Sequence, residues 1–175
     1  GESFFSFLPR SIFGGLRSAL CIEAAKAQRQ KRLPYGPGNR VISGLILQLL
    51  LYILVLSTLG WKAAVALICI SFIAILQLEA VNYFEHYGLS RRQVSPGRFE
   101  RVSEMHSWDD CSRVSAYFLA NLQRHSDHHL RPGERYNNLS LLEGAPQLPA
   151  GYATMLLLAL VPPLWFYVMD PRVKG

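Results

Sequence analysis

An all-α integral membrane protein is the fold class that this sequence predicts, and three observations lead to it. Half of the 175 residues are hydrophobic and only 17% are charged, whereas an average soluble domain has about 25% charged residues. The apolar residues gather in two long runs after residue 40 and a shorter run after residue 150. The first run is long enough to cross the roughly 30 Å hydrocarbon core of a bilayer. We therefore expect a helical bundle that forms a single domain over residues 1–175.

The first 33 residues predict an amphipathic helix that lies in the membrane interface. Apolar residues at every fourth position form one stripe, and basic residues occupy the other faces. An amphipathic helix packed on protein would show the same pattern. Residues 33–38, rich in proline and glycine, are expected to end this helix. The stripe consists of Leu8, Ile12, Leu16 and Leu20, and the basic residues are Arg10, Arg17, Lys26 and Arg29.

Two transmembrane spans are expected at residues 41–61 and 63–84. The first contains no charged residue, and Trp61 stands where an aromatic residue of the membrane interface belongs. Gly60, Trp61 and Lys62 are expected to form a tight turn between the spans, which together make a transmembrane hairpin.

The distribution of basic residues predicts the orientation of this hairpin. Seven Lys and Arg residues precede the first span, one lies between the spans and ten follow the second. The positive-inside rule therefore places both chain ends in the cytoplasm. Residues 85–175, which form the predicted metal-site and C-terminal region, would then be cytoplasmic, as would every histidine.

Charge and cysteine content narrow the class of partner. The net charge of +6 suits a membrane surface, and no basic motif with interleaved aromatic residues indicates nucleic acid. The three cysteines, Cys21, Cys69 and Cys111, are far apart and form no C-x-x-C pair. They give no sign of a zinc site and weakly favour a reducing environment.

A cluster of histidines is the clearest functional signal. His125, His128 and His129 stand at positions i, i+3 and i+4, so on a helix all three imidazoles project from one face. Such a face suits iron, copper, nickel or zinc. A polar turn in which histidines happen to cluster is the alternative.

His86 is a candidate fourth ligand at the end of the second span. Asn82, Glu85 and His86 share one helix face, and polar residues at a span end usually face a bundle interior or a cavity. A neighbouring acid would then orient a ligand ring. By itself, His86 would more often be an interfacial histidine bonded to backbone.

The segment before the cluster is expected to be a helix that starts at Ser107 as N-cap, with Asp109 and Asp110 in its first turn. Val114, Phe118 and Leu122 would share a face that His125 continues. For His106 we expect a capping or structural role. A long loop follows the cluster, and the apolar residues 152–168 are interrupted by Pro162 and Pro163, which indicates a membrane-surface or core-packed segment instead of a span. All residues named in this paragraph are numbered as in the printed sequence.

Two motifs resemble those of bacterial membrane-bound alkane 1-monooxygenases. Residues 82–89 read N-Y-F-E-H-Y-G-L and resemble the family's N-Y-x-E-H-Y-G motif. Residues 122–129 read L-Q-R-H-S-D-H-H, which is also a motif of that family. Shorter similarities extend along most of the chain. Either motif alone indicates the wider superfamily of membrane fatty acid desaturases and hydroxylases, and together they indicate the alkane hydroxylase branch.

The resemblance implies a non-haem di-iron enzyme of the inner membrane, with several membrane passes. It would hydroxylate the terminal methyl group of n-alkanes with O2, using electrons from rubredoxin and, through it, rubredoxin reductase. By position, the iron ligands and catalytic residues would be His86, His125, His128 and His129, and no separate cofactor-binding residue is expected. The arginines at positions 91, 92, 98 and 101 would dock the acidic carrier, although the positive-inside signal alone explains them.

The resemblance also implies that this chain is the C-terminal half of a longer protein. The family has two earlier histidine boxes, and no histidine precedes His86 here. The chain would then supply only part of the ligands for two irons and would be inactive alone. The alternatives are a xylene or fatty-acyl hydroxylase or desaturase of the same superfamily, and a non-catalytic membrane protein that binds a metal for transport or sensing. A zinc protease is disfavoured because there is no H-E-x-x-H helix.

Overall fold

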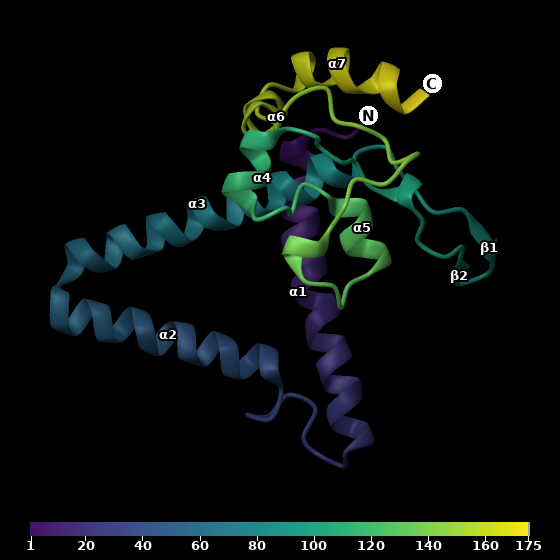
Figure 1. Cartoon of the computed structure of the whole chain (residues 1–175). Coiled ribbons are helices and arrows are strands. Elements are labelled where there is room, and N and C mark those ends of the chain that lie inside the picture. The colour runs from purple at the N-terminus through teal and green to yellow at the C-terminus, as the bar shows by residue number, and fades with distance from the viewer. Residues whose placement is uncertain (175) are drawn as a thin grey trace. The chain divides into compact units, whose positions relative to one another are not determined.

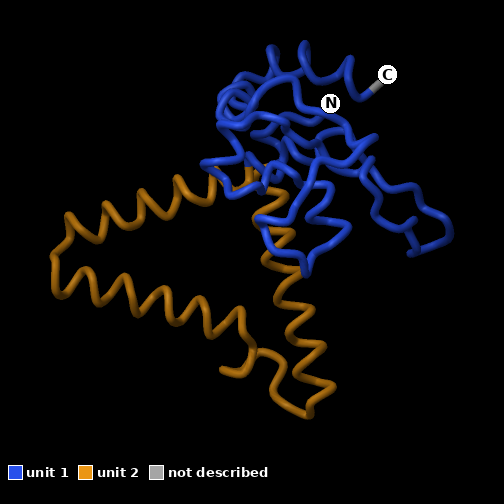
Figure 2. Tube along the Cα trace, in the orientation of Figure 1, with its two compact units in different colours: residues 1–7, 80–175 blue, residues 8–79 orange. Residues whose placement is uncertain are grey.

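The computed structural model describes residues 1–174, and their structure is almost entirely helical, as the sequence predicts (Figure 1). These residues form seven α-helices, two short 3-10 helices and one small β-hairpin. The chain divides into two compact units, one made of residues 1–7 and the chain from Ala80 onward, the other of Leu8–Glu79 (Figure 2). Helices α1 and α3 each contribute residues to both units.

Helix α1 spans Phe4–Arg29, so the helix expected in the first 33 residues is confirmed. Its location in the membrane interface stays a prediction. The helix ends where Lys31 adopts a left-handed conformation with φ of 54° and the amide of Arg32 donates to the carbonyl of Ala27 at 2.9 Å. This closure satisfies carbonyl groups that the end of a helix leaves free.

Helices α2, Arg40–Leu59, and α3, Trp61–His86, form the expected hairpin of two apolar helices, each long enough to span a membrane. The Asn39 side chain caps α2 by accepting from the amides of Val41 and Ile42. The turn is shorter than expected, because Gly60, with φ of 81°, caps α2 and Trp61 already begins α3. Helix α3 runs two residues beyond the predicted end at residue 84.

No residue of α2 is buried among the described residues. An apolar helix that leaves every side chain at least partly exposed is suited to lipid and not to water. The Tyr52 hydroxyl accepts from the Gln48 amide nitrogen at 3.0 Å and donates to Ser71 Oγ on α3 at 3.1 Å. These bonds join α2 and α3 in a region where polar groups have few other partners.

The basic segment after α3, expected to be irregular, contains a small antiparallel hairpin. Strands β1, Gln93–Ser95, and β2, Arg98–Phe99, pair Gln93 with Phe99 and Ser95 with Arg98. Pro96 and Gly97 form the turn, and the φ of 74° at Gly97 fits the third position of a type II turn.

The continuous helix expected from Ser107 to the histidine cluster is wrong. Helix α4 covers only Arg113–Leu119 and is capped by Ser112, and a separate helix α5 covers His125–Leu130. Ala120 and Asn121 are both left-handed, which ends α4 before the histidines. The expected inward face is also wrong, because Val114 and Phe118 are 66% and 86% exposed.

Tertiary hydrogen bonds explain why residues 107–110 are extended instead of helical. The amide of Trp108 donates to the carbonyl of Glu85 at 2.8 Å, and that of Asp110 donates to Gln123 at 3.0 Å. Asp109 pairs in parallel with Gln147. The backbone groups of residues 107–110 therefore bond to three different segments instead of to one another in a helical turn. Ser107 is buried and follows a short 3-10 helix, Glu104–His106, instead of serving as the expected N-cap.

Helices α6, Tyr152–Ala159, and α7, Pro162–Lys174, cover the core of the first unit. The break falls at the prolines, as expected, and Pro162 takes the first helical position, where its missing amide is harmless. Met155, Trp165 and Met169 are fully buried. The core-packed interpretation is therefore confirmed for one face of this segment. Short 3-10 helices η1, Glu104–His106, and η2, Tyr136–Asn138, complete the unit.

An aromatic cluster ties the N-terminal residues to this core. The Trp165 ring packs on Tyr83 and Tyr87, with ring centroids 5.0 and 5.1 Å apart, and Phe4 packs on Tyr83 at 5.7 Å. The Tyr83 hydroxyl donates to the Glu2 carbonyl at 2.6 Å. The last turns of α3, which carry His86, are thus held by packing from both chain ends.

Gly88 ends α3 at a place where no side chain fits. Its φ is 71°, and a Cβ atom there would lie 2.5 Å from both methyl carbons of Val173 on α7. The glycine of the N-Y-F-E-H-Y-G-L motif thus serves the packing of α7 against the end of α3.

We expect Gly88→Ala to lower the melting temperature of the protein in detergent. Left-handed backbone costs about 1–2 kcal/mol for a residue with a Cβ, and overpacking against Val173 adds about 1–3 kcal/mol. Gly97→Ala is the matched control, because Gly97 has the same sign of φ but nothing within 4 Å of the added Cβ. Equal destabilisation by the two substitutions would contradict the packing role of Gly88.

Candidate metal site

Three histidines from two helices bring one ring nitrogen each to a common point. His86 ends α3, and His125 and His129 lie one turn apart on α5. The Nε2 atoms of His125 and His129 are 2.9 Å apart, and those of His125 and His129 lie 3.3 and 3.4 Å from Nε2 of His86. Among the described residues, this is the group of ligand-type side chains close enough together to hold one metal ion.

These spacings fit the donor set of a transition metal. Two nitrogens bound at about 2.1 Å lie about 3.0 Å apart at right angles and about 3.4 Å apart at a tetrahedral angle. The three observed separations span this interval. Three lone pairs directed at one point would repel one another without a cation, so the arrangement favours a bound metal over a set of mutual hydrogen bonds.

A backbone carbonyl fixes which nitrogen of His86 faces the cluster. Nδ1 of His86 lies 3.1 Å from the carbonyl oxygen of His106, and a carbonyl can only accept, so Nδ1 carries the proton. Nε2 is then the nitrogen with the free lone pair. This is the way in which proteins commonly orient a metal-binding histidine.

His125 and His129 are held in the neutral form that can bind a metal. Burial, together with the neighbouring imidazoles His129 and His86, lowers the pKa of His125 to about 3. Burial and the neighbouring imidazoles of His86 and His128 lower the pKa of His129. At neutral pH each of these two rings therefore has one nitrogen with a free lone pair.

A buried carboxylate stands beside the histidines. Oε2 of Glu85 is 3.3 Å from Nε2 of His125, and Oε1 accepts a 2.6 Å hydrogen bond from the Tyr152 hydroxyl. Glu85 and Tyr152 are 3% and 5% exposed. Burial and the adjacent carboxylate raise the pKa of Tyr152, which keeps its hydroxyl protonated as the donor.

The acid beside His86 is predictable from the sequence, but its partner Tyr152 is not. Glu85 directly precedes His86, and so it could be found from the motif. Tyr152 lies 67 positions further along the chain, and only tertiary folding places it at the carboxylate.

A cavity of about 280 Å³ opens onto the cluster. It is lined by His86, His129, His106, Leu89, Arg91 and Val102. The cavity connects the histidines with the beginning of the basic segment that carries the β-hairpin.

A fatty acid desaturase family model matches residues 1–166. The chain belongs to the fatty acid desaturase family. The relatives of this desaturase-family chain include an alkane 1-monooxygenase of Acinetobacter baylyi, 39% identical, and alkane 1-monooxygenase 2 of Alcanivorax borkumensis, 42% identical. The xylene/toluene monooxygenase hydroxylase component of Pseudomonas putida is 31% identical. Each match covers 99% of this chain, which spans 42–46% of the length of these relatives.

Four histidines of this desaturase-family chain were predicted ligands, and the structure brings three of them together. The ring centroid of His128 lies 6.0 Å from those of His125 and His129, but His128 is outside the converging group. It lines a different cavity of about 310 Å³, together with Leu122, Glu134 and Tyr136. Around the helix axis, His128 at i+3 and His129 at i+4 lie on opposite sides of His125. The ligand role of all four histidines stays a prediction.

His106 has the capping role expected for it. Its Nδ1 accepts from the Ser103 amide at 2.9 Å, and the Ser103 side chain accepts from the amide of Met105 in return. Its Nε2 lies 3.2 Å from Glu100. The side chain of His106 is thus engaged away from the three converging nitrogens, while its carbonyl orients His86.

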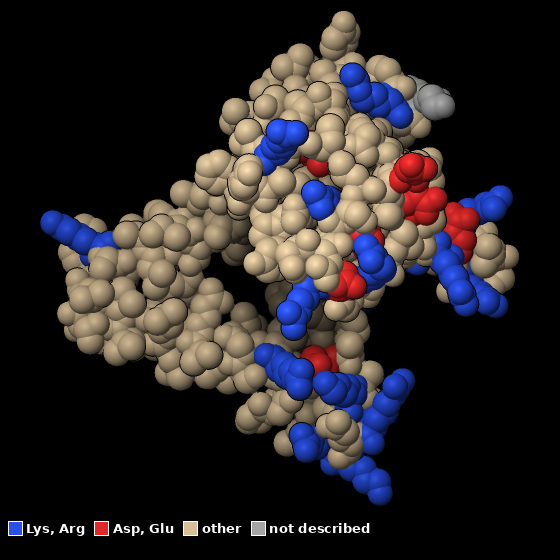
Figure 3. Space-filling view, viewed as in Figure 1, with Lys and Arg blue, Asp and Glu red and all other residues tan. Residues whose placement is uncertain are grey.

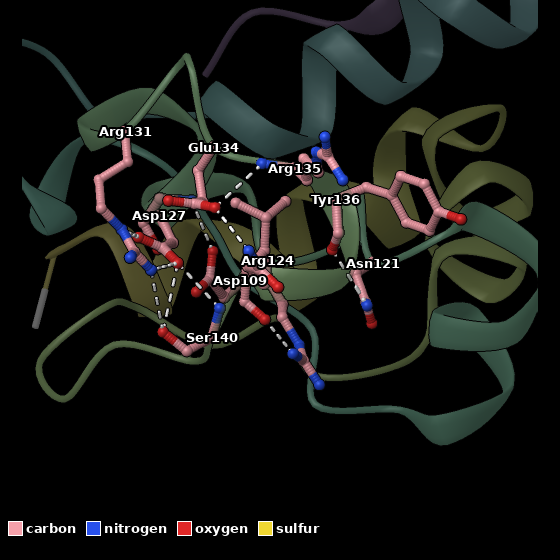
Figure 4. Close-up of polar contacts among 12 residues, drawn as sticks. Asp109, Asn121, Arg124, Asp127, Arg131, Glu134, Arg135, Tyr136 and Ser140 are labelled. Carbon is pink, nitrogen blue, oxygen red and sulfur yellow. Dashed lines mark hydrogen bonds and ion pairs between the residues drawn. The ribbon is translucent and has the colours of Figure 1, made fainter.

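Buried aspartates hold α5, and with it two of the clustered histidines (Figure 4). Arg124 provides no side-chain cap for this helix. Asp109 takes that role from another segment, since its Oδ1 accepts from the Ser126 amide at 2.8 Å. Asp127 accepts from both the guanidinium of Arg131 and the amide of Ser140, at 2.8 Å for the latter. The bond from the Ser140 amide thereby holds the loop after α5 against that helix.

Asp127 is expected to stabilise the fold in a pH-dependent way. The hydrogen bonds from Arg131 lower its pKa from 3.8 to about 2. Because the folded pKa is depressed, this stabilisation is present above about pH 4 and is lost as the pH falls toward 2. We expect Asp127→Asn to cost about 2 kcal/mol at pH 7, and the difference in melting temperature from the wild type to shrink between pH 4 and pH 3.

The control for this series is Glu143→Gln. Glu143 is exposed and has no hydrogen bond or ion pair within residues 1–174. Its substitution therefore removes one negative charge and breaks no interaction. It should leave the melting temperature unchanged at every pH. A constant gap between Asp127→Asn and the wild type from pH 7 to pH 3 would refute the ionic role of Asp127.

Proposed function

We propose that the full-length protein is a non-haem di-iron monooxygenase that hydroxylates the terminal methyl group of n-alkanes to 1-alkanols. The observation that carries this proposal is the convergence of three imidazole nitrogens at the end of an apolar membrane helix. The alkane 1-monooxygenases among the relatives support the choice of reaction.

In this proposal His86, His125 and His129 hold one iron through Nε2. Bound iron would activate O2, one oxygen atom of which enters the alcohol while the other leaves as water at the expense of two electrons from the carrier and two protons. The carbonyl of His106 keeps the proton of His86 on Nδ1, so that Nε2 stays available. Tyr152 holds the Glu85 carboxylate against the cluster, where it can accept a proton or serve as an oxygen ligand.

The second iron would need donors beyond these three. His128, with its own cavity, is a candidate ligand for it. The remaining donors would come from the part of the relatives' length that this chain does not span.

Substrate recognition would rest on apolar burial, because an alkane has no polar group. Each buried CH2 contributes about 0.8 kcal/mol, so an octane-sized chain gains several kcal/mol in a dry site. In this proposal the apolar helices α2 and α3, which are long enough to span a membrane, lie in the layer where alkanes dissolve, and α3 leads along its own length to Glu85 and His86.

The test measures iron content and octane hydroxylation by the full-length protein with rubredoxin and its reductase. We expect two irons per chain and 1-octanol as product. His129→Ala should lose one iron and more than 100-fold in activity, because one of three converging donors is gone. His106→Gln is the control and should retain both irons, since the ring nitrogens of His106 contact Ser103 and Glu100 and are not among the converging donors.

His128→Ala distinguishes the two assignments of that residue. Loss of an iron would support its role at the second site, and full retention would contradict it. Retention of both irons by His129→Ala would refute the proposed metal site itself. Iron without 1-octanol would leave the metal site standing and reject the substrate.

Xylene hydroxylation is the second candidate, favoured by the relative that is 31% identical over 99% of the chain. The same enzyme preparation should therefore be given xylene in parallel. Turnover of xylene with no turnover of octane would replace the alkane proposal.

We also propose that rubredoxin, an acidic carrier, docks beside the β-hairpin. Exposed arginines surround this hairpin, and Arg91 also lines the cavity that reaches His86 and His129. A basic surface attracts an acidic partner and increases the rate of encounter. An electron delivered here would enter close to the proposed iron. The arginines are Arg91, Arg92, Arg98 and Arg101.

Replacing Arg98 and Arg101 together by glutamine should raise the KM for rubredoxin about five- to ten-fold. The kcat at saturating rubredoxin should stay the same, and the dependence of KM on salt should weaken. The control is Arg113→Gln with Arg135→Gln, which removes two exposed charges elsewhere. An equal effect of both pairs would mean that net charge, and not this surface, attracts the carrier.

A further inference from the structure

A second cavity lies entirely within the unit Leu8–Glu79, between the end of α1 and the start of α2. Its volume is about 190 Å³, several times the roughly 30 Å³ that a water molecule occupies in the liquid. The space is therefore sufficient for a small anionic group. Seven residues line it: Glu23, Lys26, Ala27, Gln30, Arg32, Gly38 and Arg40.

The cavity is positively charged, and part of that charge has no partner. Lys26 pairs with Glu23 at 3.5 Å, and the carboxylate of Glu23 also accepts from the backbone amide of Arg40 at 3.3 Å. The guanidinium groups of Arg32 and Arg40 have no hydrogen bond or ion pair within residues 1–174. Three cations against one acid leave a net charge of +2 at the cavity. Figure 3 shows blue side chains gathered around a red one at this end of the unit.

Hydrogen bonds fix the backbone of the cavity wall, so the positions from which Arg32 and Arg40 extend are set before a ligand arrives. Asn39 is fully buried, donates from its side chain to the Pro34 carbonyl at 3.0 Å and caps α2. The amide of Asn39 donates to Gly36 at 2.9 Å. Residues 34–40 therefore form an ordered connection between the two helices.

The position along the chain sets the depth of this cavity in a membrane. Arg40 is the first residue of α2, and the next 21 residues contain no charge. The N-terminal end of an apolar span lies at the level of the lipid headgroups. Basic pockets beside membrane helices at that level bind anionic headgroups, and the uncovered apolar side chains of α2 offer a surface for acyl chains.

We infer that this cavity binds the phosphate of an anionic phospholipid headgroup. The phosphate would lie between Arg32 and Arg40, near Lys26, with the acyl chains along α2. A free phosphate ion would satisfy the same cations, but it would gain nothing from α2. This inference does not depend on the proposed monooxygenase activity, because it concerns none of the histidines.

Native mass spectrometry of the full-length protein in detergent tests this inference, with phosphatidylglycerol compared against phosphatidylcholine of the same chains. We expect phosphatidylglycerol to bind more tightly to the wild type. The variant Arg32→Gln with Arg40→Gln should lose about 25-fold in that affinity, since each basic residue near a membrane surface contributes about five-fold. A separate thermal-shift arm uses inorganic phosphate at the same concentrations.

The control pair is Arg29→Gln with Lys31→Gln, which removes two neighbouring charges that do not line the cavity. It should keep the preference for phosphatidylglycerol. An equal loss of affinity for phosphatidylglycerol in both double variants would overturn the inference, because the overall positive charge of this region would then explain binding. Equal affinity for the two lipids would overturn it too, as would equal protection by inorganic phosphate.

Glu23→Gln is expected to raise the affinity for phosphatidylglycerol, whereas the double arginine variant lowers it. It removes the acid of the cavity, while the amide oxygen can still accept from the amide of Arg40. We expect phosphatidylglycerol to bind about five-fold more tightly. If the double arginine variant fails to fold, this variant decides the question, and an unchanged or weaker affinity would overturn the inference.

Discussion

The extended segment Ser107–Asp110 is the constraint on which the candidate site depends. Its backbone bonds to the carbonyl of Glu85 at the end of α3 and to Gln123 just before α5. The Asp109 carboxylate then caps α5 through the Ser126 amide. One short piece of chain thus fixes both helices that carry the clustered histidines. Nitrogens that must meet within tenths of an ångström need such support, because a metal site is only as well formed as the groups that orient its ligands.

This support places several ionisable groups in the interior. Glu85, Asp109 and Asp127 are each at most 3% exposed, and an isolated charge in such a place is costly. Each is met by specific donors: a tyrosine hydroxyl, a backbone amide, or a guanidinium together with a backbone amide. The neutral histidines beside Glu85 contribute lone pairs instead of charge. A cation at their centre would balance the carboxylate and satisfy the lone pairs together, which is why geometry and electrostatics agree on a metal.

The membrane helices have different requirements from the rest of the chain. Helix α2 buries no residue among those described, and its polar groups are linked to α3 through Tyr52. Its end near α1 carries the cations that suit a headgroup. Helix α3 changes along its length from an apolar span to a last turn with Tyr83, Glu85 and His86, which are held by aromatic packing and by hydrogen bonds. One helix therefore joins the apolar layer to the candidate site.

Much of the fold could be predicted because it follows from local patterns. The uncharged run after residue 40 determined the hairpin, and Pro162 and Pro163 determined the break before α7. The spacing in both motifs indicated the histidines, since ligand chemistry resides in residue type and order. The helix from Ser107 was predicted wrongly because its capping residues were judged without the segments that they pair with.

The sequence by itself thus determined the membrane class, the two apolar helices long enough to span a membrane and the residues able to bind a metal, since periodicity and side-chain chemistry are local properties. Only the tertiary structure decided that His86 meets His125 and His129, that His128 faces another cavity and that Tyr152 reaches Glu85. These outcomes depend on contacts between residues tens of positions apart. A helix of six residues has no preferred direction of its own, and its histidines point where the surrounding backbone bonds hold them.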